Sequence, residues 1–242
     1  MSGSRLSALA RCGRDDDVSE GPDHDLDALV RRVDPDRWMS SRFVSDGEAR
    51  ADLISLYAFD HELARAPRVA SNPLIGEIRL TWWGEALDEI FEARPVRRHP
   101  AALALADVVR RRDLPREPLE AMIEARAREL DGSLLDEAAA LAWARDTGGL
   151  AAELAARILD PAADATAARS AGAAWALGRK AAEAPALAPL VARTLGEARM
   201  AARRLTPTAF PAVAHAALAR HRAASALSKR LRLTWAVARG LI

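Results

Sequence analysis

The sequence predicts an all-α protein, and three features of its composition carry that prediction. Half of the 242 residues are hydrophobic, which is enough apolar side chain for one sizeable core. Alanine and leucine dominate, aromatic residues make up only 5%, and β-branched residues are sparse, so helix is favoured over strand. No segment has the alternating pattern of a strand, and no repeat of fixed period occurs. We therefore expect one helical domain over residues 23–242, preceded by a polar, disordered tail over residues 1–22.

Start and stop signals place the first helices in order. Two short helices are expected over residues 25–32 and 37–44, separated by Asp34-Pro35-Asp36. Ser45 and Glu48 stand three residues apart and can satisfy each other's free amides as a capping box, which fixes the start of a central helix. Asn72-Pro73 should open the next helix, which runs to about Phe91, because Asn caps a helix and Pro is tolerated in its first turn.

Proline and glycine divide the second half of the chain in the same way. His99-Pro100 and Leu114-Pro115 precede two further helices. A long Ala/Leu-rich helix follows, with a bend expected near Thr147-Gly148-Gly149. The helices predicted in this half cover about residues 101–112, 116–131, 134–159, 164–184, 190–204 and 211–239.

Charge and cysteine content exclude several classes of function. The 35 basic and 34 acidic side chains nearly cancel, so no overall field draws the chain to nucleic acid. The single cysteine, Cys12, excludes an internal disulfide and is compatible with a reducing compartment. No apolar run approaches the roughly 18 residues of a membrane span, and the N-terminus lacks the apolar core of a secretory signal. We expect a bacterial cytoplasmic protein, with peripheral contact to the inner membrane as an extension and an organelle matrix as the less favoured location.

One carboxylate of the central helix falls on its apolar side. At about 100° per residue, Arg50, Tyr57, Asp60 and Ala64 share one side of this helix, and Glu62 lies opposite. Burial of an unpaired carboxylate is costly, so Asp60 requires a partner. Two interpretations are open: a structural acid that pairs with an arginine or caps a neighbouring helix, and a member of a functional site.

An ordered set of short motifs gives the first indication of a family. Leu56-Tyr57-Ala58-Phe59 is preceded by Arg50 and followed by Arg79-Leu80-Thr81-Trp82-Trp83. Further pieces follow in order: His99-Pro100-Ala101-Ala102-Leu103, Leu114-Pro115, the stretch 125–131, Thr147-Gly148-Gly149, Ala171-Gly172-Ala173-Ala174 and Ala209-Phe210-Pro211. Together they resemble the squalene/phytoene synthase family over about residues 25–240. The resemblance implies an all-α isoprenoid synthase fold with a central cavity or a filled core, and in active members the head-to-head joining of two prenyl diphosphates.

The groups that perform this chemistry in the family are absent from the sequence. Active members hold Mg²⁺ between two Asp-rich motifs on facing helices. The resemblance assigns the aspartates of the first motif to positions that here are Ala64 and Arg68, and places His61 where an arginine is usual. In the second motif Glu183 and Leu187 take the two aspartate positions. One glutamate cannot complete a facing clasp for a hard cation.

The candidate site residues follow from these alignments. Asp60 and Glu183 are the candidates for any residual catalysis, and no metal ligands are predicted. The residues expected to line a substrate site or cavity are Arg50, Tyr57, Asp60, His61 and Ala64. An acidic stripe formed by Glu85, Asp88, Glu89 and Glu92 has the spacing to hold a cation, but such a stripe is usually a solvated helix face.

Three functions remain open. The first is a non-catalytic relative that serves as a binding or assembly factor, similar to the respiratory complex I assembly-factor branch of the family. The second is a prenyl-diphosphate transferase with an altered site that uses Asp60 and Glu183, and Mg²⁺ is expected as a cofactor only in this case. The third is an isoprenoid or lipid carrier. The expected partner is accordingly a protein or a prenyl lipid, and the basic, amphipathic stretch 217–241 could add contact with a membrane surface.

Overall fold

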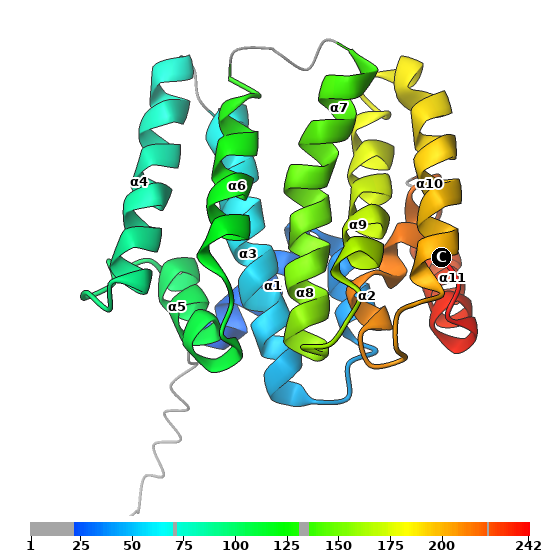
Figure 1. The fold of residues 1–242 in the computed structure, drawn as a ribbon, viewed down its shortest axis with the longest axis horizontal. Coiled ribbons are helices and arrows are strands. Elements are labelled where there is room, and N and C mark those ends of the chain that lie inside the picture. Colours follow the sequence, from blue (N-terminus) through cyan, green and yellow to red (C-terminus); the bar gives the residue numbers. More distant parts are fainter. Residues whose placement is uncertain (1–21, 70–71, 131–135, 222) are drawn as a thin grey trace, which may run out of the picture.

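Upright helices packed side by side form the body of the protein (Figure 1). The computed structural model describes residues 22–69, 72–130, 136–221 and 223–242, so the predicted tail over residues 1–22 lies almost wholly outside the described residues. No strand occurs in the described part of the chain, and the predicted all-α class is confirmed. In Figure 1, α4 lies at one edge of the bundle, and α10 and α11 lie at the other.

The helices of the first half follow the predicted start and stop signals closely. They are α1 (Pro22–Val33), α2 (Pro35–Ser41), α3 (Gly47–Val69), α4 (Pro73–Phe91), α5 (Pro100–Arg112) and α6 (Arg116–Ala127). Asn72 caps α4 as expected, because its Oδ1 accepts from the Leu74 amide at 2.9 Å. The predicted Ser45 cap of α3 is wrong. Asp46 takes that role, with its Oδ1 accepting from the Glu48 amide at 2.9 Å and the Ala49 amide at 3.4 Å.

The second half departs from prediction in one long segment. Its elements are α7 (Glu137–Ala144), a π-helical turn η1 (Arg145–Gly149), α8 (Leu150–Leu159), α9 (Ala165–Lys180), α10 (Ala188–Ala202) and α11 (Ala226–Arg239), with short 3₁₀ turns η2 (Pro185–Leu187), η3 (Phe210–Ala212) and η4 (Ala214–Leu218). The single helix expected over residues 211–239 is wrong. Residues 210–218 form buried 3₁₀ turns instead, and α11 begins only after Ser225, whose Oγ accepts from the Ser228 amide at 3.3 Å.

The π-helical turn allows two helices to approach closely. The predicted bend at Thr147-Gly148-Gly149 lies within η1, which packs against α9. A Cβ atom added to Gly148 would come within 2.8 Å of both the Gly172 carbonyl oxygen and the Ala176 Cβ. The two glycine motifs identified in the sequence therefore meet each other in the bundle.

Helix α3 lies at the centre of the core and positions the candidate site. Leu53, Leu56, Phe59 and Leu63 are fully buried, and α3 packs against α1, α4, α5, α6 and α8. These apolar side chains fix the rotation of the helix. Asp60 is thereby held inside the bundle, facing α2 and α6.

Candidate functional site

A small pocket lies in the middle of the bundle, around Asp60. It is lined by side chains of α1, α2, α3, α6, α7, η1 and α9 and by residues that flank α1 and α9. The described residues leave about 110 Å³ in it. Ligand pockets usually measure roughly 300–1,000 Å³, and a water molecule occupies about 30 Å³. The pocket can hold a few waters but not a prenyl chain.

Asp60 lies at the centre of this pocket between two buried arginines. Arg37 Nη1 donates to Asp60 Oδ2 at 2.5 Å, and Arg126 Nη2 donates to Oδ1 at 3.0 Å. Burial alone would raise the pKa of Asp60, but the two guanidinium groups outweigh it and hold that pKa well below its usual range. Asp60 is therefore an ionised partner of two cations, and a metal ion would approach it only against their charge.

The ion pairs continue on both sides of Asp60. Arg126 Nη1 also donates to Glu129 Oε1 at 2.7 Å, and the Trp143 indole donates to the same oxygen at 2.7 Å. On the other side, Arg37 lies 3.7 Å from a carboxylate oxygen of Asp34. Burial raises the pKa of Asp34 and outweighs the attraction of Arg37 and Arg179. The network joins α2, α3 and α6 and connects three carboxylates through two arginines.

Aromatic rings fill the space around Arg37. Its guanidinium lies 4.2 Å from the Trp175 ring centroid and 5.1 Å from that of Tyr57. Trp175 in turn meets the buried His215 ring edge to face at 5.0 Å. Burial raises the pKa of the Tyr57 hydroxyl far above its usual range and lowers that of His215 well below it. Uncharged rings therefore pack the region where a substrate cavity would open.

The structure brings together most of the residues predicted to line the site. Asp60, His61, Ala64 and Glu183 all line the pocket. Tyr57 lies behind it, against Arg37. Glu183 is at the outer rim, where its side chain is 56% exposed and its Oε2 accepts from Lys180 Nζ at 3.1 Å.

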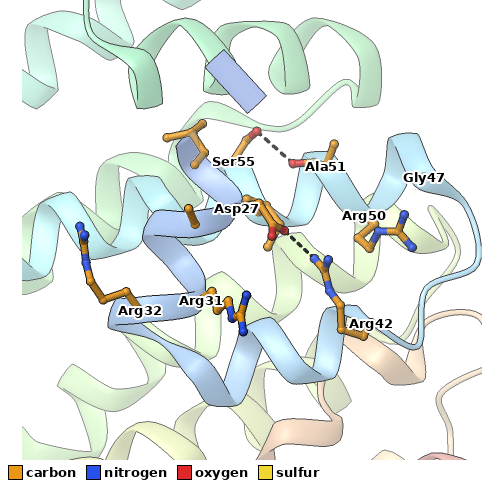
Figure 2. Close-up of a pocket in the computed structure, with 11 residues that line it drawn as sticks. Asp27, Arg31, Arg32, Arg42, Gly47, Arg50, Ala51 and Ser55 are labelled. Atoms are coloured by element: carbon orange, nitrogen blue, oxygen red, sulfur yellow. Dashed lines mark hydrogen bonds and ion pairs between the residues drawn. The ribbon is translucent and has the colours of Figure 1, made fainter. Parts of the chain in front are cut away.

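Arg50 does not join the other predicted residues. It lines a separate hollow between α1 and α3, and its Nη1 donates to the Val44 carbonyl at 3.2 Å (Figure 2). It occupies the first turn of α3, whereas Asp60 lies past the middle of the same helix. Arg50 therefore cannot act on a group bound at Asp60.

Sequence reasoning missed the partners of Asp60. Arg37, Arg126 and Trp175 complete the pocket, but they come from α2, α6 and α9. The cost of an unpaired buried acid indicated that an arginine would be found. Nothing in the spacing of the 35 basic residues indicates which one, because the answer depends on how the helices pack.

The acidic stripe on α4 is occupied by arginines. Arg97 Nη2 donates to Glu89 Oε1 at 2.7 Å, and these hydrogen bonds lower the pKa of Glu89 to about 2. Arg116 Nη2 donates to Asp88 at 2.5 Å. Within the described residues, no group of three or more His, Cys, Asp or Glu side chains has the geometry to hold a metal ion.

Comparisons with known proteins show the family and the fold. The family model described as squalene/phytoene synthase matches residues 30–181, more than half of the chain. Two solved structures share the fold over nine-tenths of the chain. A dehydrosqualene synthase crystallised with a ligand gives a TM-score of 0.72 at 12% identity and covers 90% of this chain and 95% of that one. A squalene synthase from Alicyclobacillus acidocaldarius gives 0.63 at 16% identity, covering 91% and 94%.

Curated relatives match a shorter stretch. The protein named NADH dehydrogenase (ubiquinone) complex I, assembly factor 6, is 30% identical over 113 residues in Bos taurus, which is 47% of this chain and 33% of the relative. The Homo sapiens protein of the same name is 29% identical over 111 residues, or 46% and 33%. The chain thus matches about a third of the length of these relatives.

Proposed function

The chain belongs to the squalene/phytoene synthase family, and we propose that it is a non-catalytic member that assists the assembly of a respiratory NADH dehydrogenase complex. The proposal that the protein is non-catalytic rests on the ion pairs of Asp60, the one carboxylate of α3 that lies inside the pocket. It is held between Arg37 and Arg126. Ala64 and Arg68 line the same pocket at the positions that the family resemblance assigns to aspartates.

The remaining space argues against the two alternatives. A prenyl transferase must admit two prenyl chains and a carrier must admit one. The described residues leave about 110 Å³ at this place, well under the roughly 300 Å³ at which ligand pockets begin. Glu183 could act with Asp60 only if Asp60 left its two guanidinium partners, which would leave Arg126 with Glu129 alone and Arg37 with only the more distant Asp34.

The assembly role rests on the relatives. They are named as assembly factors of complex I, and about half of this chain aligns with them at about 30% identity. A protein partner that docks on the outer surface of the bundle is therefore the proposed ligand, in preference to a prenyl lipid bound inside it.

A deletion and complementation experiment tests the proposal. The gene is deleted in its source cell, and the assembled NADH dehydrogenase complex in membranes is measured on native gels by in-gel NADH oxidation. We expect the assembled complex to decrease, and both the wild-type gene and a Glu183→Gln variant to restore it. Full assembly in the deletion strain would contradict the assembly role. Failure of Glu183→Gln alone would point to chemistry at the rim of the pocket.

We also propose that α11 brings the protein to the inner face of the membrane at which that complex is built. No helix in the described ranges is long and apolar enough to cross a bilayer. Leu227, Leu231 and Trp235 are each more than half exposed and repeat every four residues along α11. The helix carries four basic residues and no acidic one. An apolar stripe with cationic flanks is the pattern of a helix that lies in an anionic lipid interface.

Vesicle co-sedimentation tests this contact. We expect the protein to sediment with vesicles that contain phosphatidylglycerol, and a Leu231→Ser/Trp235→Ser variant to remain in solution. A matched control is Leu74→Ser/Ile78→Ser, which removes two exposed apolar side chains at the same spacing from α4. Equal sedimentation of the α11 variant and the wild type would contradict the proposed contact.

A further inference from the structure

A second hollow lies between α1, the end of α2 and the first turns of α3 (Figure 2), and it shares no lining residue with the pocket around Asp60. Its volume is about 720 Å³, within the roughly 300–1,000 Å³ of ligand sites. Four arginines line it: Arg31, Arg32, Arg42 and Arg50. Asp27 is the one carboxylate among its lining residues. The hollow is therefore strongly cationic, although the whole chain has a net charge of only +1.

Uncharged neighbouring groups help to orient three of these arginines. The guanidinium groups of Arg31 and Arg42 both lie over the Trp38 ring, at 5.1 and 4.7 Å from its centroid. Arg50 is oriented by a hydrogen bond to the neutral Val44 carbonyl at 3.2 Å. Cations ordered in this way lose less conformational freedom when a ligand binds.

The hollow has fewer carboxylates than arginines, so most of its arginines are not paired as they are elsewhere in the bundle. Arg42 Nη2 donates to Asp27 Oδ1 at 2.8 Å, and Asp27 also accepts from the Trp38 indole at 3.0 Å. Arg31, Arg32 and Arg50 form no ion pair with any residue that the structure describes. Arg112, in contrast, bonds Asp52 at 2.7 Å. Three uncompensated guanidinium groups around one hollow favour an anion with several oxygen atoms.

The hollow also contains an apolar part. Leu26, Ala28, Ala51 and Ile54 line it with apolar surface. Ser55, the remaining small polar side chain, is occupied because its Oγ donates to the Ala51 carbonyl at 3.0 Å. A ligand that fits both parts has a polyvalent anionic group beside an apolar one.

We propose that this hollow binds a ligand in which a phosphate group is joined to an apolar portion, with the phosphate at Arg31 and Arg50, which are oriented but form no ion pair, and the apolar portion on Leu26 and Ile54. Guanidinium groups match the oxygen spacing of phosphate, and several of them approach its tetrahedral oxygens from different directions more readily than the two oxygens of a carboxylate. The ligand is either a soluble phosphate ester or a phospholipid. The proposal is independent of the assembly role, because it concerns a different surface of the bundle.

Calorimetric titration of the full chain tests it with four probes: octyl phosphate, dihexanoyl phosphatidic acid, inorganic phosphate and octanoate. We expect saturable binding of octyl phosphate or phosphatidic acid, with weaker binding of the two probes that lack either the apolar portion or the phosphate. The tighter of the first two identifies the source as a soluble ester or a phospholipid. Octanoate that binds as tightly as octyl phosphate would overturn the proposal, as would tighter binding of a polyglutamate peptide, which would indicate an acidic protein segment.

Matched variants locate the binding. Arg31→Gln/Arg50→Gln should weaken the affinity by about tenfold or more, because it removes two charge-assisted contacts. Arg145→Gln/Arg203→Gln removes the same charge from exposed positions outside the hollow and should leave the affinity unchanged. Leu231→Ser/Trp235→Ser should also bind normally, which separates this site from the α11 contact. An unchanged affinity in the first variant, or an equal loss in the second, would overturn the proposal. Thermal unfolding midpoints confirm that each variant is folded.

Discussion

At the residue scale, the ion pairs of a single carboxylate, Asp60, determine what chemistry the pocket can support. Asp60 is 6% exposed and accepts hydrogen bonds from two arginines that are as deeply buried. A buried acid with two cationic partners stabilises the packing of three helices but offers no base and no metal ligand. The geometry therefore favours the structural interpretation of Asp60 that the sequence left open beside a functional one.

Substitution of Asp60 should cost a large part of the protein's stability. Asp60→Asn keeps the shape of the side chain but leaves Arg37 and Arg126 buried with less counter-charge, so the free energy of unfolding should fall by about 3–5 kcal/mol. Urea denaturation followed by circular dichroism measures this change. Glu183→Gln, at the exposed rim, should cost less than about 1 kcal/mol. If both variants unfold like the wild type, the ion-pair network does not stabilise the bundle.

His215 should make stability depend on pH in the mildly acidic range. Its ring is buried, and burial, reinforced by Arg37 and Arg179, lowers its pKa well below the ordinary value of 6.5. Below pH 6.5 the unfolded chain takes up a proton that the folded chain does not, so stability falls as pH falls, by at most about 1.4 kcal/mol per unit for one such group.

Comparison of two pH profiles isolates this contribution. His61 and His221 also have lowered pKa values, but they titrate in both proteins and cancel in the difference. The unfolding free energy of His215→Phe, measured between pH 7.5 and 5.5, should decline less steeply than that of the wild type. Identical slopes would show that His215 takes up its proton in the folded state.

At the scale of elements, the contact between η1 and α9 sets how closely two helices approach. Gly148 and Gly172 face each other there, and neither position has room for a Cβ atom. We expect Gly148→Ala to lower the unfolding free energy by about 1–3 kcal/mol, the usual cost of overpacking. Gly196→Ala on α10, where nothing lies within 4 Å, should instead raise it by about 0.4–1 kcal/mol. If chemical denaturation showed that both substitutions change the unfolding free energy by the same amount and in the same direction, helix propensity alone would govern both sites.

The sequence predicted helix boundaries well where a capping side chain or a proline ring constrains the backbone next to it. Asn72 caps α4 and Pro100 begins α5, because these effects depend only on neighbouring residues. The prediction of one helix over residues 211–239 was wrong because tertiary packing determines the conformation of its first part. Ala214, His215 and Leu218 are buried against α2 and α9 in 3₁₀ turns, so the high helix propensity of the alanines is overridden. The partners of Asp60 escaped prediction for the same reason.

At the scale of the whole molecule, the bundle has the fold of its family, and little space remains at its centre. Trp143, Trp175 and the ion pairs around Asp60 occupy the centre and leave about 110 Å³. The two surfaces proposed to bind ligands, the α11 stripe and the hollow around Arg31 and Arg50, are both on the outside. Both proposals therefore place recognition on the surface of the bundle and not in its interior.

Restoration of the missing carboxylates should not restore an enzyme. In Ala64→Asp/Arg68→Asp the two new carboxylates would lie one helical turn apart on α3 and line the pocket. The end of α9 and the turn after it still offer Lys180 and a single Glu183, and the pocket still lacks room for a prenyl chain. We expect no Mg²⁺-dependent turnover of farnesyl diphosphate by this variant. Turnover that appears on substitution would show that loss of the carboxylates alone, and not closure of the cavity, abolished catalysis.

The most direct test of a non-catalytic protein is an assay of the wild type itself. Purified protein is incubated with farnesyl or geranylgeranyl diphosphate and Mg²⁺, and released diphosphate is measured beside a sample without protein. The filled pocket and the Asp60 ion pairs predict no release above that background. Diphosphate release that disappears in both Asp60→Asn and Glu183→Gln, with Glu183→Gln shown to be folded, would contradict the account.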